Sequence, residues 1–126
     1  ADLDIDIQGS WQAIEYVYTD PADPQNVVDV IERDGASFAL EIDETGTALG
    51  TFDDGDGGTS SQSGTVEYWR QVIGTNYQRG VRVTLGANVF TGTLGGEVLT
   101  LTEESTDFDF GAGVMESRLR IVLTRR

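Results

Sequence analysis

The last part of the chain alternates between apolar and polar residues with a period of two. In residues 114–124 the large apolar side chains fall on one side, and the charged side chains fall mostly on the other. The apolar positions are Met115, Leu119, Ile121 and Leu123, and the polar positions are Glu116, Arg118, Arg120 and Thr124. A period of two is typical of a β-strand that buries one face. This segment is therefore predicted to be a strand with its apolar face in a core.

Similar runs recur along the whole chain. Strand patterns cover residues 9–18, 37–42, 47–52, 65–73, 77–85, 89–94 and 98–102. Residues 1–7 alternate Asp with Leu or Ile, which predicts a first strand or an arm that joins a sheet edge. The alternation in 9–18 is imperfect, which predicts a bend or a β-bulge. Residues 27–32 fit either a short strand or a single helical turn.

Segments rich in Gly, Pro and Asp separate these runs. Residues 43–46 are predicted to form a hairpin turn, in which Gly46 can take a positive φ angle. Residues 19–26 hold both prolines and are predicted to be a loop. Residues 53–64 are predicted to be a flexible low-complexity loop, and residues 103–113 a long connection. The other connections are short, so consecutive strands are expected to pair as hairpins.

The chain of 126 residues is long enough for one domain with its own core. Eight or nine strands joined by mostly short turns predict an all-β, up-and-down antiparallel barrel that spans residues 1–126. Closing the sheet removes both exposed edges, and an eight-stranded barrel has room for side chains or one small ligand. A flat sandwich of two sheets is the structural alternative.

The composition narrows the chemistry. Cysteine and histidine are absent, and all eight basic residues are arginine. Disulfides, thiolate metal sites, Ser-His-Asp triads and lysine Schiff bases are therefore excluded. No apolar stretch approaches the roughly 18 residues that a membrane-spanning helix needs, so no membrane span is expected.

The net charge of −14 is unevenly distributed. Residues 1–56 hold fifteen of the 22 acidic residues but only one arginine, Arg33. Such a surface repels nucleic-acid phosphates and anionic membranes, so no nucleic-acid partner is expected. The charge indicates either high solubility or a surface that attracts cations or a basic partner.

One set of segments resembles a known family. Gly9-Ser10-Trp11 is a G-x-W motif near the start of a barrel strand, and the last strand carries arginines. Together with residues 43–52, 95–102, 107–110 and 119–125, it resembles bacterial lipocalin-like domains of the calycin group. In that family the Trp plugs the closed end and an Arg packs across its ring, which implies Trp11 and either Arg118 or Arg120 here. The resemblance also implies a secreted, periplasmic or envelope protein.

Aromatic and apolar walls with a few polar anchors are typical of a ligand pocket. The residues predicted to line the barrel interior or its rim are Tyr16, Tyr18, Tyr68, Trp69, Arg70, Tyr77 and Arg79. The alternative is that the rings fill the core and the arginines pair with carboxylates across strands. A cavity of roughly 300–1,000 Å³ would favour ligand binding, and a packed interior would favour a structural role.

Two further sites are predicted from carboxylates. Asp53, Asp54 and Asp56 lie among glycines and could bind a hard cation such as Ca²⁺, although a solvated acidic loop is the alternative. Glu15 and Glu67 could be buried acids or bases with a raised pKa, and the alternative is an ion pair with an arginine. No catalytic residue and no other cofactor is assigned.

Taken together, these features favour a binding module for a small apolar or amphipathic ligand. A structural or interaction domain with a filled barrel is one alternative. A small β-barrel enzyme of the isomerase or cyclase type is the other. No particular oligomeric state is implied.

Overall fold

The fold is given by a computed structural model that describes residues 7–111 and 113–126, with the backbone alone at residues 70–73 and 76–78. Within this part of the chain there are nine strands and one short helix. In chain order the elements are β1 (Gly9–Asp20), β2 (Asp23–Asp29), α1 (Val30–Asp34), β3 (Ser37–Ile42), β4 (Thr47–Asp53), β5 (Thr59–Ile73), β6 (Asn76–Leu85), β7 (Asn88–Gly95), β8 (Val98–Asp109) and β9 (Val114–Arg125).

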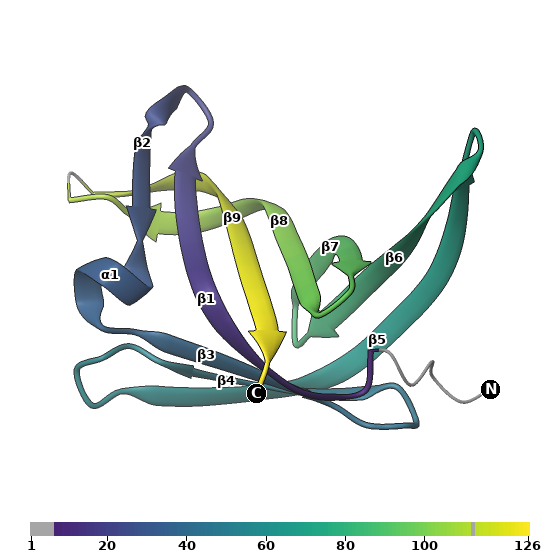
Figure 1. Cartoon of the computed structure of the whole chain (residues 1–126). Helices are drawn as coiled ribbons and strands as arrows, with labels where there is room; N and C mark the ends of the chain where they lie inside the picture. Colours follow the sequence, from purple (N-terminus) through teal and green to yellow (C-terminus); the bar gives the residue numbers. More distant parts are fainter. Residues whose placement is uncertain (1–6, 112) are drawn as a thin grey trace.

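The strands form one closed antiparallel sheet (Figure 1). Over the described residues the strand order is β2-β1-β3-β4-β5-β6-β7-β8-β9, and β1 also pairs with β9. This pairing closes eight strands into a barrel and leaves β2 as an additional strand beside the C-terminal part of β1. Closure pairs the edges of β1 and β9 that a flat sheet would expose. The predicted all-β, up-and-down barrel is confirmed, and the sandwich alternative is wrong.

β1 contains the bulge that its imperfect alternation predicts. The β1–β9 register shifts between Ala13 and Glu15, and the Ile14 side chain is exposed. Trp11 and Ala13 are buried before the shift, and Tyr16 is buried after it. One extra residue therefore turns even-numbered positions inward in the second half of the strand.

A second register shift lies in β8, between Glu103 and Thr106. The buried Ser117 hydroxyl of β9 donates a hydrogen bond to the Thr106 carbonyl oxygen at 3.0 Å. This bond satisfies a backbone acceptor where the ladder is irregular. Beyond the shift, Phe108 packs against the core.

Apolar side chains from the eight barrel strands fill the middle of the barrel. The alternation predicted for the last strand is confirmed for Leu119, Ile121 and Leu123, which are buried between more exposed residues, but Met115, predicted on the same buried face, is exposed. The largest fully buried side chains among the described residues are Trp11, Ile7, Leu40, Leu99, Leu101, Leu119, Ile121, Leu123, Val81, Val83 and Ser117. Removing these apolar side chains from water is the main favourable contribution to folding.

Three predicted loops are partly strand. β2 begins at Asp23, β5 begins at Thr59 and β8 continues to Asp109, so the loops expected at residues 19–26, 53–64 and 103–113 are shorter. Residues 59–65 pair along the whole of β4. These polar segments carry little apolar signal, but their backbones supply hydrogen bonds that neighbouring strands would otherwise lack.

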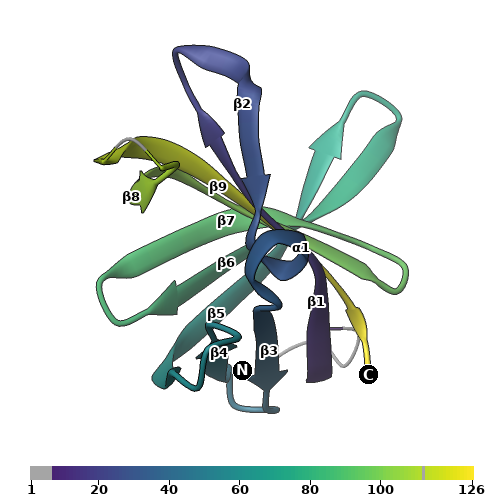
Figure 2. The same ribbon diagram turned by 90° about the vertical axis from the view of Figure 1, so that its left-hand side faces the viewer.

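The ambiguous segment at residues 27–32 divides between the end of β2 and the start of α1. Asp29 caps the helix, because its Oδ1 accepts a hydrogen bond from the Ile31 amide at 3.0 Å. Gly35 ends the helix in the left-handed conformation, with a φ of 69°. Val30 and Ile31 pack against the core, and α1 lies across one end of the barrel, at the centre of Figure 2.

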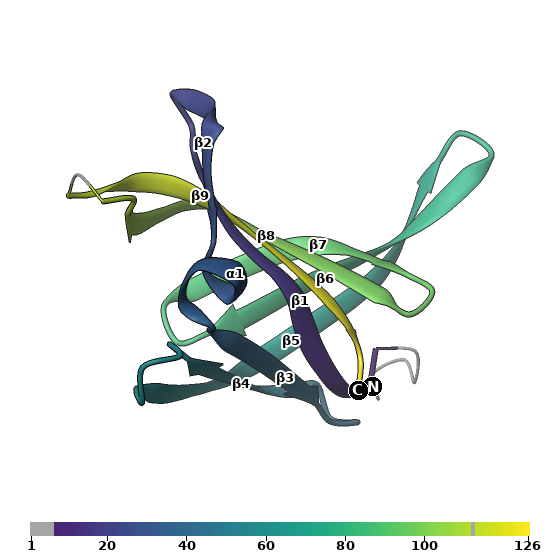
Figure 3. The same ribbon diagram turned by 60° about the vertical axis from the view of Figure 1, so that its left-hand side comes forward.

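The two ends of the barrel therefore differ. The helix end carries α1 and the β4–β5 and β8–β9 loops, and the plugged end carries Trp11 and the β3–β4 turn. Gly46 has a φ of 87° in that turn, as predicted. The β1–β2 and β5–β6 hairpins extend beyond the barrel wall (Figure 3). Among the described residues no helix is long and apolar enough to span a membrane.

Candidate functional site

Trp11 closes the plugged end, as the G-x-W motif implies. Its side chain is 0% exposed, and its Nε1 donates a hydrogen bond to the Ile7 carbonyl oxygen at 3.0 Å. The Arg125 guanidinium lies over the ring, with its central carbon 4.5 Å from the ring centroid. Arg125 Nη1 also donates to the Gln8 carbonyl oxygen at 2.6 Å. The ring is therefore fixed by a hydrogen bond, a cation–π contact and burial.

The covering cation is Arg125, so the prediction of Arg118 or Arg120 is wrong. Trp11 pairs with Arg125 across β1 and β9, and odd-numbered positions of β9 face inward. The two even-numbered arginines consequently face outward. Arg118 Nε lies 3.2 Å from an oxygen of Glu104, and Arg120 Nη2 lies 3.6 Å from an oxygen of Glu15.

The helix end contains a cavity of about 220 Å³, here called the aromatic cup. Its lining residues are Tyr16, Tyr18, Phe38, Gly50, Phe52, Ser60, Gln62, Leu85, Asn88 and Phe90. The rings come from β1, β3, β4 and β7, and the polar side chains come from β5 and β7. Convergent rings with a few polar groups at their margin match the usual lining of a small-molecule site.

The rings of the cup contact one another. The Tyr16 ring centroid lies 5.2 Å from that of Phe52 and 5.7 Å from that of Phe38. The Tyr18 centroid lies 5.8 Å from that of Tyr16. Tyr18 also stacks on Phe108, with 3.9 Å between centroids and an interplanar angle of 7°. These contacts restrict the ring orientations and give the cup a preformed shape.

Arg33 connects α1 to this series of rings. Its guanidinium carbon lies 5.0 Å from the Phe108 centroid. Its Nε and Nη2 donate hydrogen bonds to the Asp34 carboxylate, each at 2.8 Å. The helix is therefore held beside the cup by a cation–π contact as well as by apolar packing.

Glu103 is a buried carboxyl near the cup, with 9% of its surface exposed. Burial raises the pKa of this carboxyl, and a hydrogen bond from Thr106 partly opposes the shift. Burial also raises the pKa values of the Tyr16 and Tyr18 phenols. The nearby negative charge of Glu103 raises both pKa values further. The fold thus favours the proton-bearing forms of these three groups, in which each can donate a hydrogen bond.

Glu103→Gln should stabilise the protein at neutral pH. The pKa of Glu103 is higher in the folded than in the unfolded chain, so the native protein loses stability as the pH rises through the folded value. A glutamine side chain stays neutral, so the gain should be small below about pH 4 and should grow towards pH 7. Urea unfolding at several pH values measures it. Glu104→Gln, at the neighbouring exposed position, is the control. An effect of Glu103→Gln that does not vary with pH would contradict this expectation.

Four of the predicted lining residues can be placed in or towards the interior. Tyr16 and Tyr18 line the aromatic cup. Tyr68 and Arg79 occupy inward-facing positions of β5 and β6, nearer the plugged end. Tyr68 pairs with the buried Val81, and Arg79 lies two residues before Val81 on the same face of β6. The Tyr68 hydroxyl is buried without a hydrogen-bond partner within the described structure. The predicted interior residues therefore do not form one site.

Trp69 was predicted to line the barrel interior or its rim, and this is wrong. Its side chain lies on the outer wall, is 38% exposed and covers Gly80, its partner across β5 and β6. The Arg82 guanidinium lies 5.9 Å from its ring centroid. The sequence could not decide this, because residues 65–73 have apolar side chains on both faces. The side chains of Arg70 and Tyr77 lie outside the described residues.

Phe38, Phe52, Phe90 and Glu103 were not identified from the sequence as site residues. Phe38 lies in the strand that was predicted at residues 37–42, and the structure shows that its buried side chain borders a cavity. Glu103 continues the inward series of Leu99 and Leu101 at intervals of two, which was the available signal. Residue 103 was instead predicted to begin the long connection at residues 103–113.

Glu15 and Glu67 lie on the outer wall, so neither is a buried acid or base. Glu15 pairs with Arg120, and an oxygen of Glu67 lies 3.5 Å from Arg82 Nη1. The ion-pair alternative is therefore confirmed for both residues. Each pair is exposed to solvent and contributes little to stability.

The carboxylates of the Asp-rich loop organise the loop itself. Asp53 Oδ1 accepts a hydrogen bond from the Gly55 amide at 2.9 Å, and Asp54 Oδ1 accepts from the Asp56 and Gly58 amides at 2.8 and 3.0 Å. In the part of the chain that the structure describes, no group of three acidic side chains could hold a metal ion. The geometry does not support the predicted Ca²⁺ site at Asp53, Asp54 and Asp56, and favours the solvated loop.

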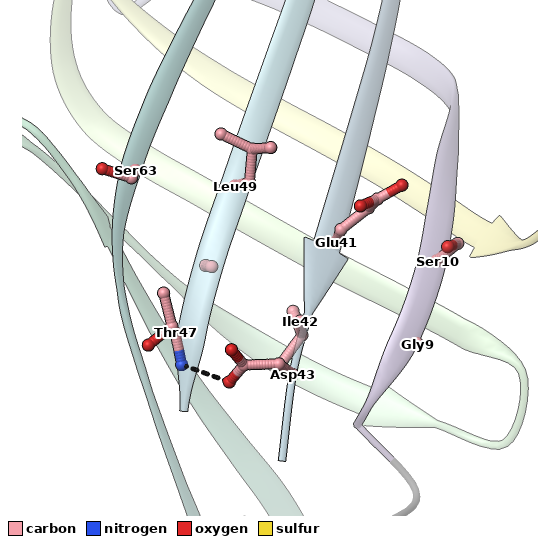
Figure 4. A pocket seen from close by; sticks show the side chains of 9 residues that line it. Gly9, Ser10, Glu41, Ile42, Asp43, Thr47, Leu49 and Ser63 are labelled. Carbon is pink, nitrogen blue, oxygen red and sulfur yellow. Dashed lines mark hydrogen bonds between the residues drawn. The ribbon is translucent and has the colours of Figure 1, made fainter. Parts of the chain in front are cut away.

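A larger depression of about 450 Å³ lies on the barrel wall near the plugged end (Figure 4). Glu41, Leu49 and Ser63 line it, and all three are exposed on the outer face. Its Asp43 carboxylate accepts a hydrogen bond from the Thr47 amide at 3.0 Å, which stabilises the β3–β4 turn. This surface lacks the converging rings of the aromatic cup, so the cup is the stronger candidate site.

Comparison with known proteins gives a single result. No family model, curated protein or solved structure matches the chain. The closed eight-stranded antiparallel barrel is consistent with a calycin-like architecture. Function must accordingly be inferred from the geometry of the cup.

Proposed function

We propose that this chain is a lipocalin-like module that binds a small apolar or amphipathic ligand in the aromatic cup. The observation that carries the proposal is the cavity at the helix end, in which rings from four strands converge. The buried tryptophan under an arginine at the opposite end also supports the lipocalin resemblance. The same resemblance would make it a bacterial protein of the envelope, the periplasm or the exterior.

The size of the cup limits the ligand. Its volume of about 220 Å³ is below the roughly 300–1,000 Å³ of most ligand sites, because the middle of the barrel is filled. A ligand with one ring or one compact head group would fit, while a longer ligand would extend past Ser60, Gln62 and Asn88. The apolar part would contact the rings, and a polar group would reach the Tyr18 hydroxyl or the exposed polar side chains.

Two other functions have specific observations in their favour. The filled middle of the barrel favours a structural or interaction domain, for which the cup would be incidental. Glu103, beside the Tyr16 and Tyr18 phenols, is the carboxyl that an isomerase or cyclase would use for proton transfer. A structural or interaction domain would bind no small ligand in the cup. An isomerase or cyclase would convert the ligand that it binds there into a product.

Indole, a neutral amphipathic ring compound, should bind the native protein in isothermal titration calorimetry. Gly50→Ala should weaken binding about tenfold, because the added Cβ enters the cup and overpacks it. That Cβ would lie 2.7 Å from a terminal carbon of Leu85 and 3.2 Å from the Phe38 ring.

Gly95→Ala is the matched control, because no atom lies within 4 Å of its added Cβ. It should bind indole as the native protein does. Equal affinities of the two alanine variants, or no heat of binding with the native protein, would contradict the proposed function.

A further inference from the structure

The faces of the cup rings offer a specific kind of attraction. Aromatic faces carry partial negative charge and attract cations that lie within about 6 Å of the ring centroid. The rings of Phe38 and Phe52 each lie within 6 Å of the Tyr16 ring, and these three rings line one cavity together with Tyr18 and Phe90. A cation in this cavity would lie close to several rings at once.

The same kind of contact forms elsewhere within this protein, including at both ends of the barrel. The Arg33 guanidinium lies 5.0 Å from the Phe108 ring, which itself stacks on Tyr18 of the cup. At the plugged end, the Arg125 guanidinium lies 4.5 Å from the Trp11 ring. The aromatic rings at both ends of the barrel thus already contact a positively charged group.

The charges around the cup favour a cation over an anion. Asp53 ends β4 at the helix end, Asp54 and Asp56 follow in the β4–β5 loop, and Asp107 and Asp109 lie near the end of β8. Arg33, on α1 at this end, is already paired with Asp34. With a net charge of −14, the protein attracts cations, and an opening beside acidic loops concentrates them.

We infer that the ligand of the aromatic cup is a small organic cation whose ammonium head group lies against the rings of Tyr16, Tyr18, Phe38, Phe52 and Phe90. This inference rests on the proposed function and specifies its ligand class. The cavity of about 220 Å³ suits a compact head group with a short tail. The ring faces would hold the head group, as in other sites for quaternary ammonium groups, and the polar side chains of Ser60, Gln62 and Asn88 would contact the tail.

Choline and its uncharged analogue, in which carbon replaces the nitrogen, form the matched probe pair. In calorimetry at low ionic strength, choline should bind the native protein at least about tenfold more tightly than the analogue. Its affinity should fall as salt is added, because salt screens the acidic loops. The affinity of the analogue should change little with salt.

A single substitution tests whether the ring faces are responsible. Phe52→Leu keeps an apolar side chain at a partly buried position but removes a ring face. It should lower choline affinity about tenfold and should change the affinity of the analogue much less. Trp69→Leu removes an exposed ring on the outer wall and should leave choline binding unchanged.

Equal binding of choline and its analogue would overturn the cation inference and leave the proposed apolar binding function standing. Binding of neither probe would also overturn it, and the indole titration would then decide separately whether the cup binds ligands. Equal loss of choline affinity in Phe52→Leu and Trp69→Leu would exclude the cup as the site of cation binding.

Discussion

Replacing Trp11 by Ala should lower the free energy of unfolding by about 3–5 kcal/mol. The side chain is fully buried, so the substitution removes a large apolar surface and leaves a cavity at the plugged end. It also removes the hydrogen bond to the Ile7 carbonyl oxygen and leaves the Arg125 guanidinium without its aromatic partner. Because β1 joins β3 and β9 at this point, the loss should affect closure of the barrel. Equilibrium urea unfolding measures the change.

Trp69→Ala is the control for Trp11→Ala, since it removes the second tryptophan from the outer wall. Trp69 is 38% exposed, and we expect a loss of only about 1 kcal/mol. If the two variants lost similar free energy, Trp11 would not be the plug and the lipocalin resemblance would lose its main structural support.

Replacing Gly92 by Ala should lower the free energy of unfolding by about 3 kcal/mol. An added Cβ would lie only 1.7 Å from the Thr100 carbonyl oxygen of the neighbouring strand β8. That oxygen belongs to the backbone, so it cannot move aside as a flexible side chain can. The β7–β8 pair would have to separate or bend where the sheet curves, which weakens the paired ladder.

Gly95→Ala, in the same strand, is the matched control for Gly92→Ala. Its Cβ would meet no atom within 4 Å, so its effect should stay within about 0.5 kcal/mol. Thermal and urea unfolding of the two variants compare them directly. If Gly92→Ala left the free energy of unfolding unchanged, the close approach of β7 and β8 would not be required for closure of the barrel.

The sequence predicts the barrel well wherever alternation is strong. The alternation in residues 114–124 predicted the correct strand and, for Leu119, Ile121 and Leu123, the correct buried face, because one face is apolar and the other is charged; Met115 on the same face is exposed. Residues 59–64 were predicted as loop, because small polar residues give no alternating signal. Their strand conformation follows from pairing with β4, which is a consequence of closure and cannot be seen locally.

The candidate site was predictable only in part. Tyr16 and Tyr18 were identified, although the bulge at Ile14 decides that they face inward. Trp69 was misassigned because its place opposite Gly80 depends on the register between β5 and β6. Arg125 was missed as the cover of the plug for a similar reason, since only the β1–β9 register pairs it with Trp11. Cross-strand register and the filled or hollow state of the interior are properties of the whole sheet.

The most direct test of ligand binding in the aromatic cup is an amide NMR spectrum of the native protein titrated with indole. Binding in the cup should shift the amide signals of Tyr16, Phe38, Phe52 and Phe90, and should leave those around Trp11 unchanged. Shifts centred on Trp11 or on the outer wall at Glu41 and Leu49 would contradict a ligand site at the helix end.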